Sequence, residues 1–143
     1  MPALLVTDYG QNAVSVIPDS GSISTVPVGN DPVGIAYDYG LDSDVYVANQ
    51  GSNNVSVIEG CSITYGTQCY SVSTGLSPRE VVWDQKYLTP FVANYGSSNV
   101  STFGGGPSIS GPSGSGFLGI AYDDATDQVF VTAYNTGEVY IFS

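Results

Sequence analysis

The chain has 143 residues, of which 42% are hydrophobic and only 10% are charged, and it contains no histidine. Arg79 and Lys86 are its only basic residues against thirteen acidic ones, so the formal net charge is -11 at pH 7. This charge excludes nucleic acid as a partner, because the phosphate backbone and the chain repel each other. The lack of histidine excludes Ser-His and Cys-His catalysis and imidazole-bound metals. No apolar run is long enough to span a bilayer, so we expect no membrane insertion.

A strand-turn-strand segment occurs four times along the chain. The copy at residues 46–58 consists of an apolar strand, a polar turn rich in Gly and Asn, and a second strand. The copies start at positions 5, 46, 91 and 130, which gives periods of 41, 45 and 39 residues. Short strands that recur with periods near forty residues predict the blades of a β-propeller.

Two further strands complete the repeat. One precedes three of the copies, at residues 32–38, 78–84 and 117–123, and another follows three of them, at residues 23–28, at residues 70–74 and around residue 109. The predicted fold class is therefore all-β, with blades of four antiparallel strands and about three and a half blades in a single segment spanning 1–143. The repeat units are expected at approximately 3–31, 32–76, 77–116 and 117–143. Because the first unit lacks its inner strand and the last its outer strand, we expect self-association or the remaining repeats of a longer chain to cover the ends.

The sequence resembles the YVTN β-propeller repeats. Tyr-Val-Ala-Asn at 46–49 and Phe-Val-Ala-Asn at 91–94 match the signature, as do the following residues 51–58 and the linker 27–36. Asp8 and Ala133 replace the signature Asn in the first and last copies. The resemblance implies a propeller of the kind found in archaeal surface-layer-type and bacterial surface proteins, related to lactonase-like enzymes. It implies architecture and leaves function open.

Two features favour an extracellular or cell-surface setting. Cys61 and Cys69 bracket an insertion of about five residues in the second unit, and antiparallel pairing can bring two such residues within disulfide distance. We therefore expect a disulfide between them. Asn54 and Asn99 each begin an Asn-Val-Ser sequence that fits the N-glycosylation pattern.

One aligned position in the polar turn is aromatic in three of four copies. It holds Tyr9, Gln50, Tyr95 and Tyr134. On a ring these residues form an arc near the mouth of the central channel, where exposed aromatic faces suit sugar stacking. The alternative is that each tyrosine packs its own turn against the neighbouring blade.

Arg79 and Glu80 occur at the start of one inner strand only. They could anchor an anionic ligand at the channel mouth, or form a surface ion pair that contributes little to stability. Asp38, Asp84 and Asp123 recur at the end of the inner strand. They suit either a Ca²⁺-binding turn or, as we expect, local hydrogen bonds to turn amides. We expect no metal and no cofactor.

The favoured function is a non-enzymatic extracellular module for structural assembly or for protein or glycan interaction at a cell surface. The alternative is a propeller enzyme of lactonase or polysaccharide-lyase type, acting at the channel face through carboxylate or Tyr chemistry. The enzyme hypothesis requires acidic side chains that converge at the channel mouth. The acidic residues that could serve are scattered over different repeats.

Overall fold

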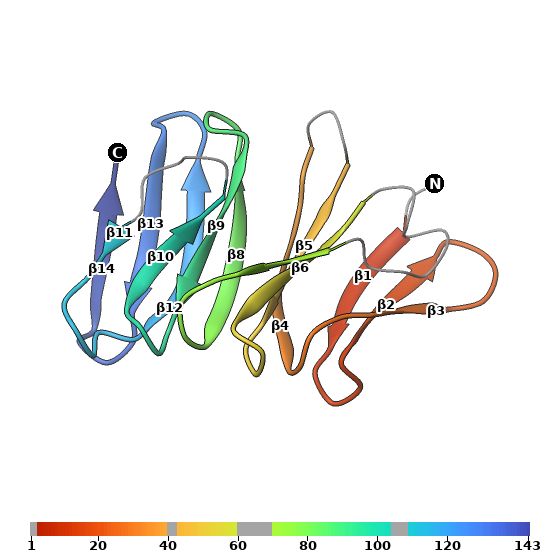
Figure 1. Ribbon diagram of the computed structural model, residues 1–143. Helices are drawn as coiled ribbons and strands as arrows, with labels where there is room; N and C mark the ends of the chain where they lie inside the picture. The colour runs from red at the N-terminus through yellow and green to blue at the C-terminus, as the bar shows by residue number, and fades with distance from the viewer. Residues whose placement is uncertain (1–2, 40–42, 60–69, 104–108) are drawn as a thin grey trace.

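The computed structural model describes residues 3–39, 43–59, 70–103 and 109–143, which form four antiparallel β-sheets (Figure 1). The predicted all-β fold class is confirmed. Within these ranges there is no helix, and so none that is long and apolar enough to cross a membrane. Cys61 and Cys69 lie outside the described residues, and their disulfide stays a prediction.

Each sheet is built from consecutive strands. The first contains β1 (Ala3–Asp8), β2 (Ala13–Pro18) and β3 (Ser24–Pro27), and the second contains β4 (Pro32–Tyr37), β5 (Val45–Asn49), β6 (Asn54–Ile58) and β7 (Tyr70–Ser73). The third contains β8 (Pro78–Asp84), β9 (Thr89–Asn94), β10 (Asn99–Thr102) and β11 (Ile109–Ser110), and the fourth contains β12 (Phe117–Asp123), β13 (Gln128–Ala133) and β14 (Glu138–Phe142). Among the described residues, the first sheet lacks the inner strand and the fourth lacks the outer strand, as predicted.

The four sheets stack side by side in chain order (Figure 1). A separate apolar cluster fills each of the three spaces between adjacent sheets. Because their sheets are covered on both faces, every residue of β5 and β9 is buried, and the two strands carry continuous rather than alternating apolar runs. Ala48 and Ala93, small residues at the same position of β5 and β9, are fully buried.

The inner strands β4, β8 and β12 contact one another in chain order. Each carries a β-bulge near its start, where the register with the next strand shifts. A bulge re-aims the side chains next to it. In β8 the bulge lies between Pro78 and Glu80, so Arg79 is the residue that it displaces.

Candidate functional site

Two asparagines at the ends of β5 and β9 are completely buried and organise the turns that follow. Asn94 Nδ2 donates hydrogen bonds to Asn99 Oδ1 at 3.0 Å and to Ser101 Oγ at 2.9 Å. The second sheet repeats this arrangement with Asn49, whose Nδ2 bonds Asn54 Oδ1 at 2.8 Å and Ser56 Oγ at 3.0 Å. We call these six residues the amide hubs of the two sheets.

The amide hubs also hold the linkers that enter their own sheets from the sheets before them. Ser56 Oγ accepts a hydrogen bond from Gly29 N at 3.2 Å, and Ser101 Oγ accepts one from Gly75 N at 3.1 Å. Buried polar groups are stable when they are paired in this way. The hubs therefore explain why Asn-Val-Ser recurs in the sequence. The side chains of Asn54 and Asn99 are half-buried and belong to the hubs. N-glycosylation at these two residues stays a prediction.

A second set of hydrogen bonds joins the polar turns of the first three sheets to the linkers that lead into the next sheets. Asn12 Oδ1 accepts from Asp31 N at 2.9 Å, and Asn53 Oδ1 accepts from Ser77 N at 2.8 Å. Asn12 and Asn53 both have positive φ, a backbone region that Asn tolerates better than most residues. In the third sheet Ser98 Oγ takes the same place and accepts from Gly116 N at 3.1 Å. These contacts join turns and linkers at one end of the sheets. We call this end, with the turns β1–β2, β5–β6, β9–β10 and β13–β14, the turn face.

Three of the predicted ligand residues meet on the turn face. The ring centroids of Tyr95 and Tyr134 are 6.3 Å apart with a tilt of 56°. The guanidinium carbon of Arg79 lies 5.2 Å from the centroid of Tyr95. Tyr95 Oη donates a hydrogen bond to Asn135 Oδ1 at 3.1 Å, whereas Tyr134 is 68% exposed. We call Arg79, Tyr95, Tyr134 and Asn135 the Arg79 cluster.

The remaining candidates of the aromatic arc do not join this cluster. Tyr9 is exposed in the first sheet, and Gln50 is half-buried in the second, held through its backbone N to Asp31 O at 3.0 Å. Within the described ranges neither side chain makes a ring contact or hydrogen bond with the cluster. The structure thus brings two of the four aligned residues together and adds Arg79 to them.

Glu80 packs against the neighbouring inner strand. It is half-buried against β4, where a Cβ on Gly34 would lie 3.1 Å from Glu80 Oε1. Burial raises the pKa of Glu80 above its ordinary value, and a backbone hydrogen bond at Val81 opposes this only in part. In the described part of the chain, the ion pair is the one between Lys86 and Asp127. Arg79 instead lies over the aromatic ring of Tyr95.

The recurring aspartates act in turns. Asp84 Oδ1 accepts hydrogen bonds from Lys86 N at 2.7 Å and Tyr87 N at 3.1 Å. Asp123 caps the corresponding turn through Thr126 Oγ1 at 2.7 Å and Ala125 N at 3.0 Å, and these bonds lower its pKa. Asp38 N donates to Asp44 O at 2.8 Å across the equivalent loop. The side-chain contacts of Asp84 and Asp123 fit the predicted local hydrogen bonds to turn amides, whereas this contact of Asp38 is made by its backbone.

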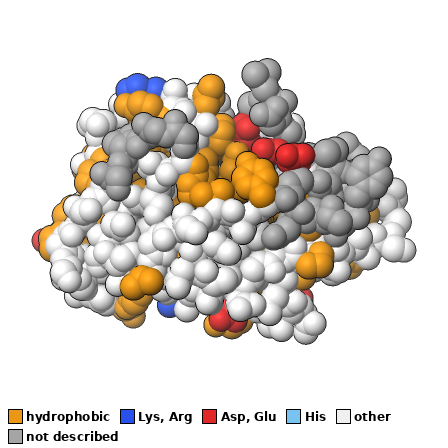
Figure 2. Space-filling model, viewed as in Figure 1, with side chains coloured by type: hydrophobic (Ala, Val, Ile, Leu, Met, Phe, Trp, Pro, Cys, Tyr) orange, Lys and Arg blue, Asp and Glu red, His pale blue; other side chains and the backbone are white. Residues whose placement is uncertain are grey.

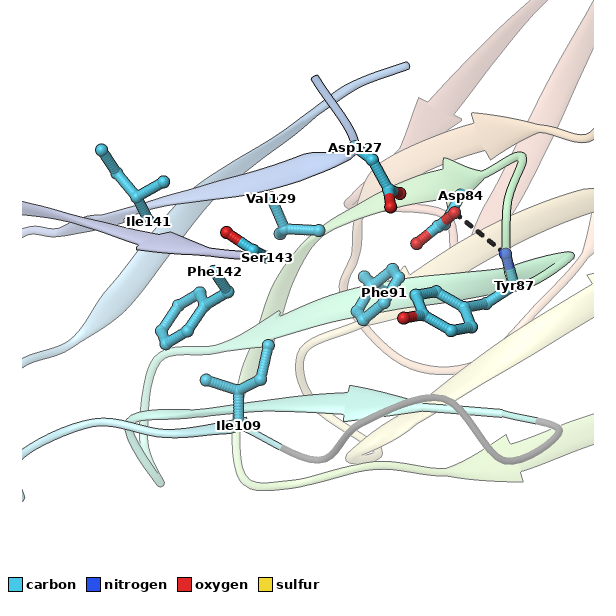
Figure 3. Close-up of a pocket in the computed structure, with 9 residues that line it drawn as sticks. All are labelled: Asp84, Tyr87, Phe91, Ile109, Asp127, Val129, Ile141, Phe142 and Ser143. Carbon is cyan, nitrogen blue, oxygen red and sulfur yellow. Dashed lines mark hydrogen bonds between the residues drawn. The ribbon is translucent and has the colours of Figure 1, made fainter. Parts of the chain in front are cut away.

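The structure also contains two hollows that the sequence does not predict. A cavity of about 260 Å³ lies between the third and fourth sheets, with Asp84 and Asp127 at one end and apolar residues such as Phe91, Val129 and Phe142 along it (Figure 3). A larger hollow of about 1690 Å³ is lined by residues of the inner strands and of the first sheet. Aromatic side chains from three sheets, namely Tyr37, Tyr39, Trp83 and Tyr122, lie along it. No sequence signal marked either hollow, because each is formed by residues from different repeats.

The surface carries few charges. Charged side chains are sparse on the face shown in Figure 2, and hydrophobic side chains gather near its centre.

Burial, together with a hydrogen bond to Asp127, raises the pKa of Tyr122 to about 12. Burial also raises the pKa of Tyr140, and the hydrogen bond to Glu138 adds to this. Both phenols are therefore protonated at neutral pH and unsuited to accept a proton from a substrate.

A scan against protein-family models finds no match, and a search of curated proteins finds no relative. Solved structures do match. Virginiamycin B lyase from Staphylococcus aureus superposes with a TM-score of 0.77 at 16% identity, over 99% of this chain and 52% of that one. A streptogramin B lyase gives a TM-score of 0.76 at 14% identity, over 99% of this chain and 51% of that one. A protein of unknown function from Desulfotomaculum acetoxidans gives 0.75 at 20% identity, over 99% of this chain and 50% of that one.

These likenesses concern the fold. The chain spans about half the length of the solved chains that it matches. At such low identity the agreement lies in the order and pairing of strands, and functional residues do not transfer with it. The four stacked antiparallel sheets and these neighbours together show that the chain has the β-propeller fold, present here as a partial set of blades.

Proposed function

We propose that the chain is a non-enzymatic β-propeller module of a cell surface that binds glycans through the Arg79 cluster. The observation that carries this proposal is the grouping of Arg79, Tyr95 and Tyr134 on the turn face. An exposed Tyr134 ring beside a half-buried Tyr95 offers apolar surface that needs no rearrangement before a ligand binds.

The chemistry of the cluster suits a sugar ring. Aromatic faces pack on the C–H groups of a pyranose, and a guanidinium offers several N–H donors to hydroxyl groups. Asn135 is held through its amide N to Gly114 O at 2.8 Å and through its oxygen to Tyr95. The amide and phenol therefore stay in place beside the exposed ring.

The expected ligand is a neutral glycan rather than an acidic one. The net charge of -11 repels anionic ligands at long range, and a single arginine offsets only a small part of it. Binding of a neutral sugar involves no charge attraction and should change little with ionic strength. The cell-surface setting itself rests on the Cys61 and Cys69 pair and on the sequons at Asn54 and Asn99, which remain sequence-based predictions.

A second candidate function is an enzyme of lactonase or polysaccharide-lyase type. It is favoured by one observation, the structural likeness to a streptogramin B lyase and a virginiamycin B lyase. Against it, Asp84 and Asp123 are engaged in turns and the pKa of Tyr122 is raised to about 12. Glu80, with its raised pKa, is a candidate for a general acid.

The test is a glycan array that includes neutral and uronate-containing oligosaccharides. We expect the unaltered chain to bind a neutral class, and Tyr134→Ala to weaken that binding about tenfold, since one aromatic contact is worth roughly 1 kcal/mol or more. Tyr87→Ala is the matched control, because Tyr87 is an exposed tyrosine on the opposite turn between β8 and β9. Absence of binding on the array, or equal binding by the Tyr134 variant, would overturn the proposal. Turnover of a lactone or polysaccharide substrate would favour the enzyme instead.

A further inference from the structure

The contact between the second and third sheets shows how adjacent sheets of this chain pack. Val55 and Val57 of β6 point at the third sheet, where they meet Val81 and Val92. All four side chains are almost completely buried. The contact therefore joins the β6 face of one sheet to a face of the next sheet that includes β9.

The fourth sheet carries the first half of this contact with nothing on it. Val139 pairs with Thr132 as Val55 pairs with Ala48, and Ile141 pairs with Phe130 as Val57 pairs with Tyr46. Val139 and Ile141 therefore occupy the positions of Val55 and Val57. Yet they are 59% and 57% exposed.

The first sheet carries the other half. Leu4 pairs with Ile17 as Val45 pairs with Ile58, and Val6 pairs with Ser15 as Val47 pairs with Ser56. Val45 and Val47 are fully buried against the sheet before them, whereas Leu4 and Val6 are 63% and 41% exposed. The two ends of the stack thus expose complementary faces of an interface that forms three times inside it, except that the first sheet has no inner strand to take the place of Val81.

We propose that two copies of this chain associate head to tail, with the β14 face of each copy on the β1 face of the other. The occupant is a second copy because each bare face of this chain finds the outer part of its internal partner surface on the other end of the same chain. Two copies also match the length of the solved neighbours, of which one copy spans about half. A head-to-tail contact made twice closes into a pair, whereas one that does not close would grow into a filament.

The association requires no exchange of strands. The sheets meet face to face, so β14 of one copy and β1 of the other need not continue one hydrogen-bonded sheet. The contact would also place Tyr9 of the second copy beside Tyr134, since Tyr95 and Tyr134 are neighbours at the same aligned position of adjacent sheets. The proposal stands independently of glycan binding, because it rests on the end faces alone.

Charge repulsion between the copies opposes the association, so the salt dependence of the association tests the proposal. Each copy carries a net charge of -11, so the copies repel each other at low ionic strength. Added salt screens this repulsion, with a Debye length of about 8 Å at 0.15 M. We expect the dissociation constant of the pair to fall as salt is added, which is opposite to the behaviour of an interface held by ion pairs.

The test is sedimentation equilibrium of the full chain over a wide range of concentration. We expect twice the mass of one chain at high concentration and a single chain on dilution. Ile141→Glu and Val6→Lys should each abolish the pair, since each places a charge in one bare face. Ile23→Glu is the matched control, because Ile23 is exposed in the connection between β2 and β3, away from both end faces. Circular dichroism melting checks that each variant is folded.

A mixture of the two charged variants distinguishes head-to-tail packing from other modes. In the mixture one contact keeps both apolar faces, and the other pairs a carboxylate with an ammonium group. We expect mixed pairs to form although neither variant pairs alone. A folded monomer at every concentration, failure of the mixture to associate, unimpaired association of the Ile141 variant, or a mass that grows without limit would overturn the proposal.

Discussion

Asn94 Nδ2 lies 2.9 Å from Ser101 Oγ on the adjacent strand, and the same hydrogen bond joins Asn49 to Ser56 at 3.0 Å one sheet earlier. Each bond fixes the end of one strand to the next and leaves the serine oxygen to hold the incoming linker. In the fourth sheet Ala133 takes the asparagine position, and Tyr140 instead bonds Glu138 Oε2 at 3.2 Å. Among the described residues, the Asn–Ser hydrogen bond is thus found in the two middle sheets.

Replacing Asn94 with alanine should lower the free energy of unfolding by about 2 kcal/mol, because buried partners in the hub lose their hydrogen bonds. Chemical denaturation monitored by tryptophan fluorescence measures the change. Gln11→Ala serves as the control, since Gln11 is exposed in the first turn and should change stability by less than about 0.5 kcal/mol. Equal stability of the two variants would show that the hub contributes nothing.

Gly29, in a linker between sheets, and Gly10, in the turn between β1 and β2, differ sharply in the space around them. A Cβ on Gly29 would lie 2.7 Å from Asn49 Cγ, whereas one on Gly10 meets nothing within 4 Å. We expect Gly29→Ala to destabilise the fold by about 1–3 kcal/mol, since the fully buried asparagine cannot move away. Gly10→Ala should be nearly neutral. Thermal melting of both variants checks the contrast, and a Gly29 variant as stable as the Gly10 variant would contradict it.

The raised pKa of Glu80 predicts a pH dependence of stability. The folded state binds the Glu80 proton more tightly than the unfolded state, so this group's contribution is fully present below its ordinary pKa of 4.5. The contribution is lost as pH rises through the raised pKa of the folded state. Glu80→Gln should therefore be more stable than the unaltered chain at pH 7, and the difference should shrink toward pH 4. Denaturation curves at several pH values test this, and a variant that is less stable at pH 7 would refute it.

The two tyrosines of the Arg79 cluster should contribute unequally to the free energy of unfolding. Tyr95 is half-buried under Arg79 and bonded to Asn135, so Tyr95→Ala should cost about 1–2 kcal/mol. Tyr134 is mainly exposed, and its replacement by alanine should change stability by less than about 0.5 kcal/mol. Urea denaturation of both variants is the measurement. A large loss in the Tyr134 variant would make that ring a packing residue.

Cys61 and Cys69 should form an intramolecular disulfide. The short loop between them gives a stabilisation on the order of 2–3 kcal/mol. Alkylation of the native protein followed by mass spectrometry counts free thiols, and none are expected without a reductant. Two alkylated cysteines in the native protein would contradict the predicted disulfide.

The sequence was sufficient for the order and kind of strands. Repeated starts at 5, 46, 91 and 130, with polar turns between apolar runs, predicted blades, and the sheets follow that order. Even the short outer strand predicted around residue 109 appears as β11. Strand period and turn chemistry are local properties, so they are legible along the chain.

Tertiary structure alone decided the roles of individual side chains. Arg79 could pair with its neighbour Glu80 or face the tyrosines, and the β-bulge in β8 together with the packing of Glu80 on Gly34 gave the second result. Likewise Val139 and Val55 occupy the same repeat position, yet one is exposed and the other buried, because only the second has a sheet stacked upon it. A repeat position specifies which face a side chain takes, but its burial and partners depend on what the rest of the chain places against that face.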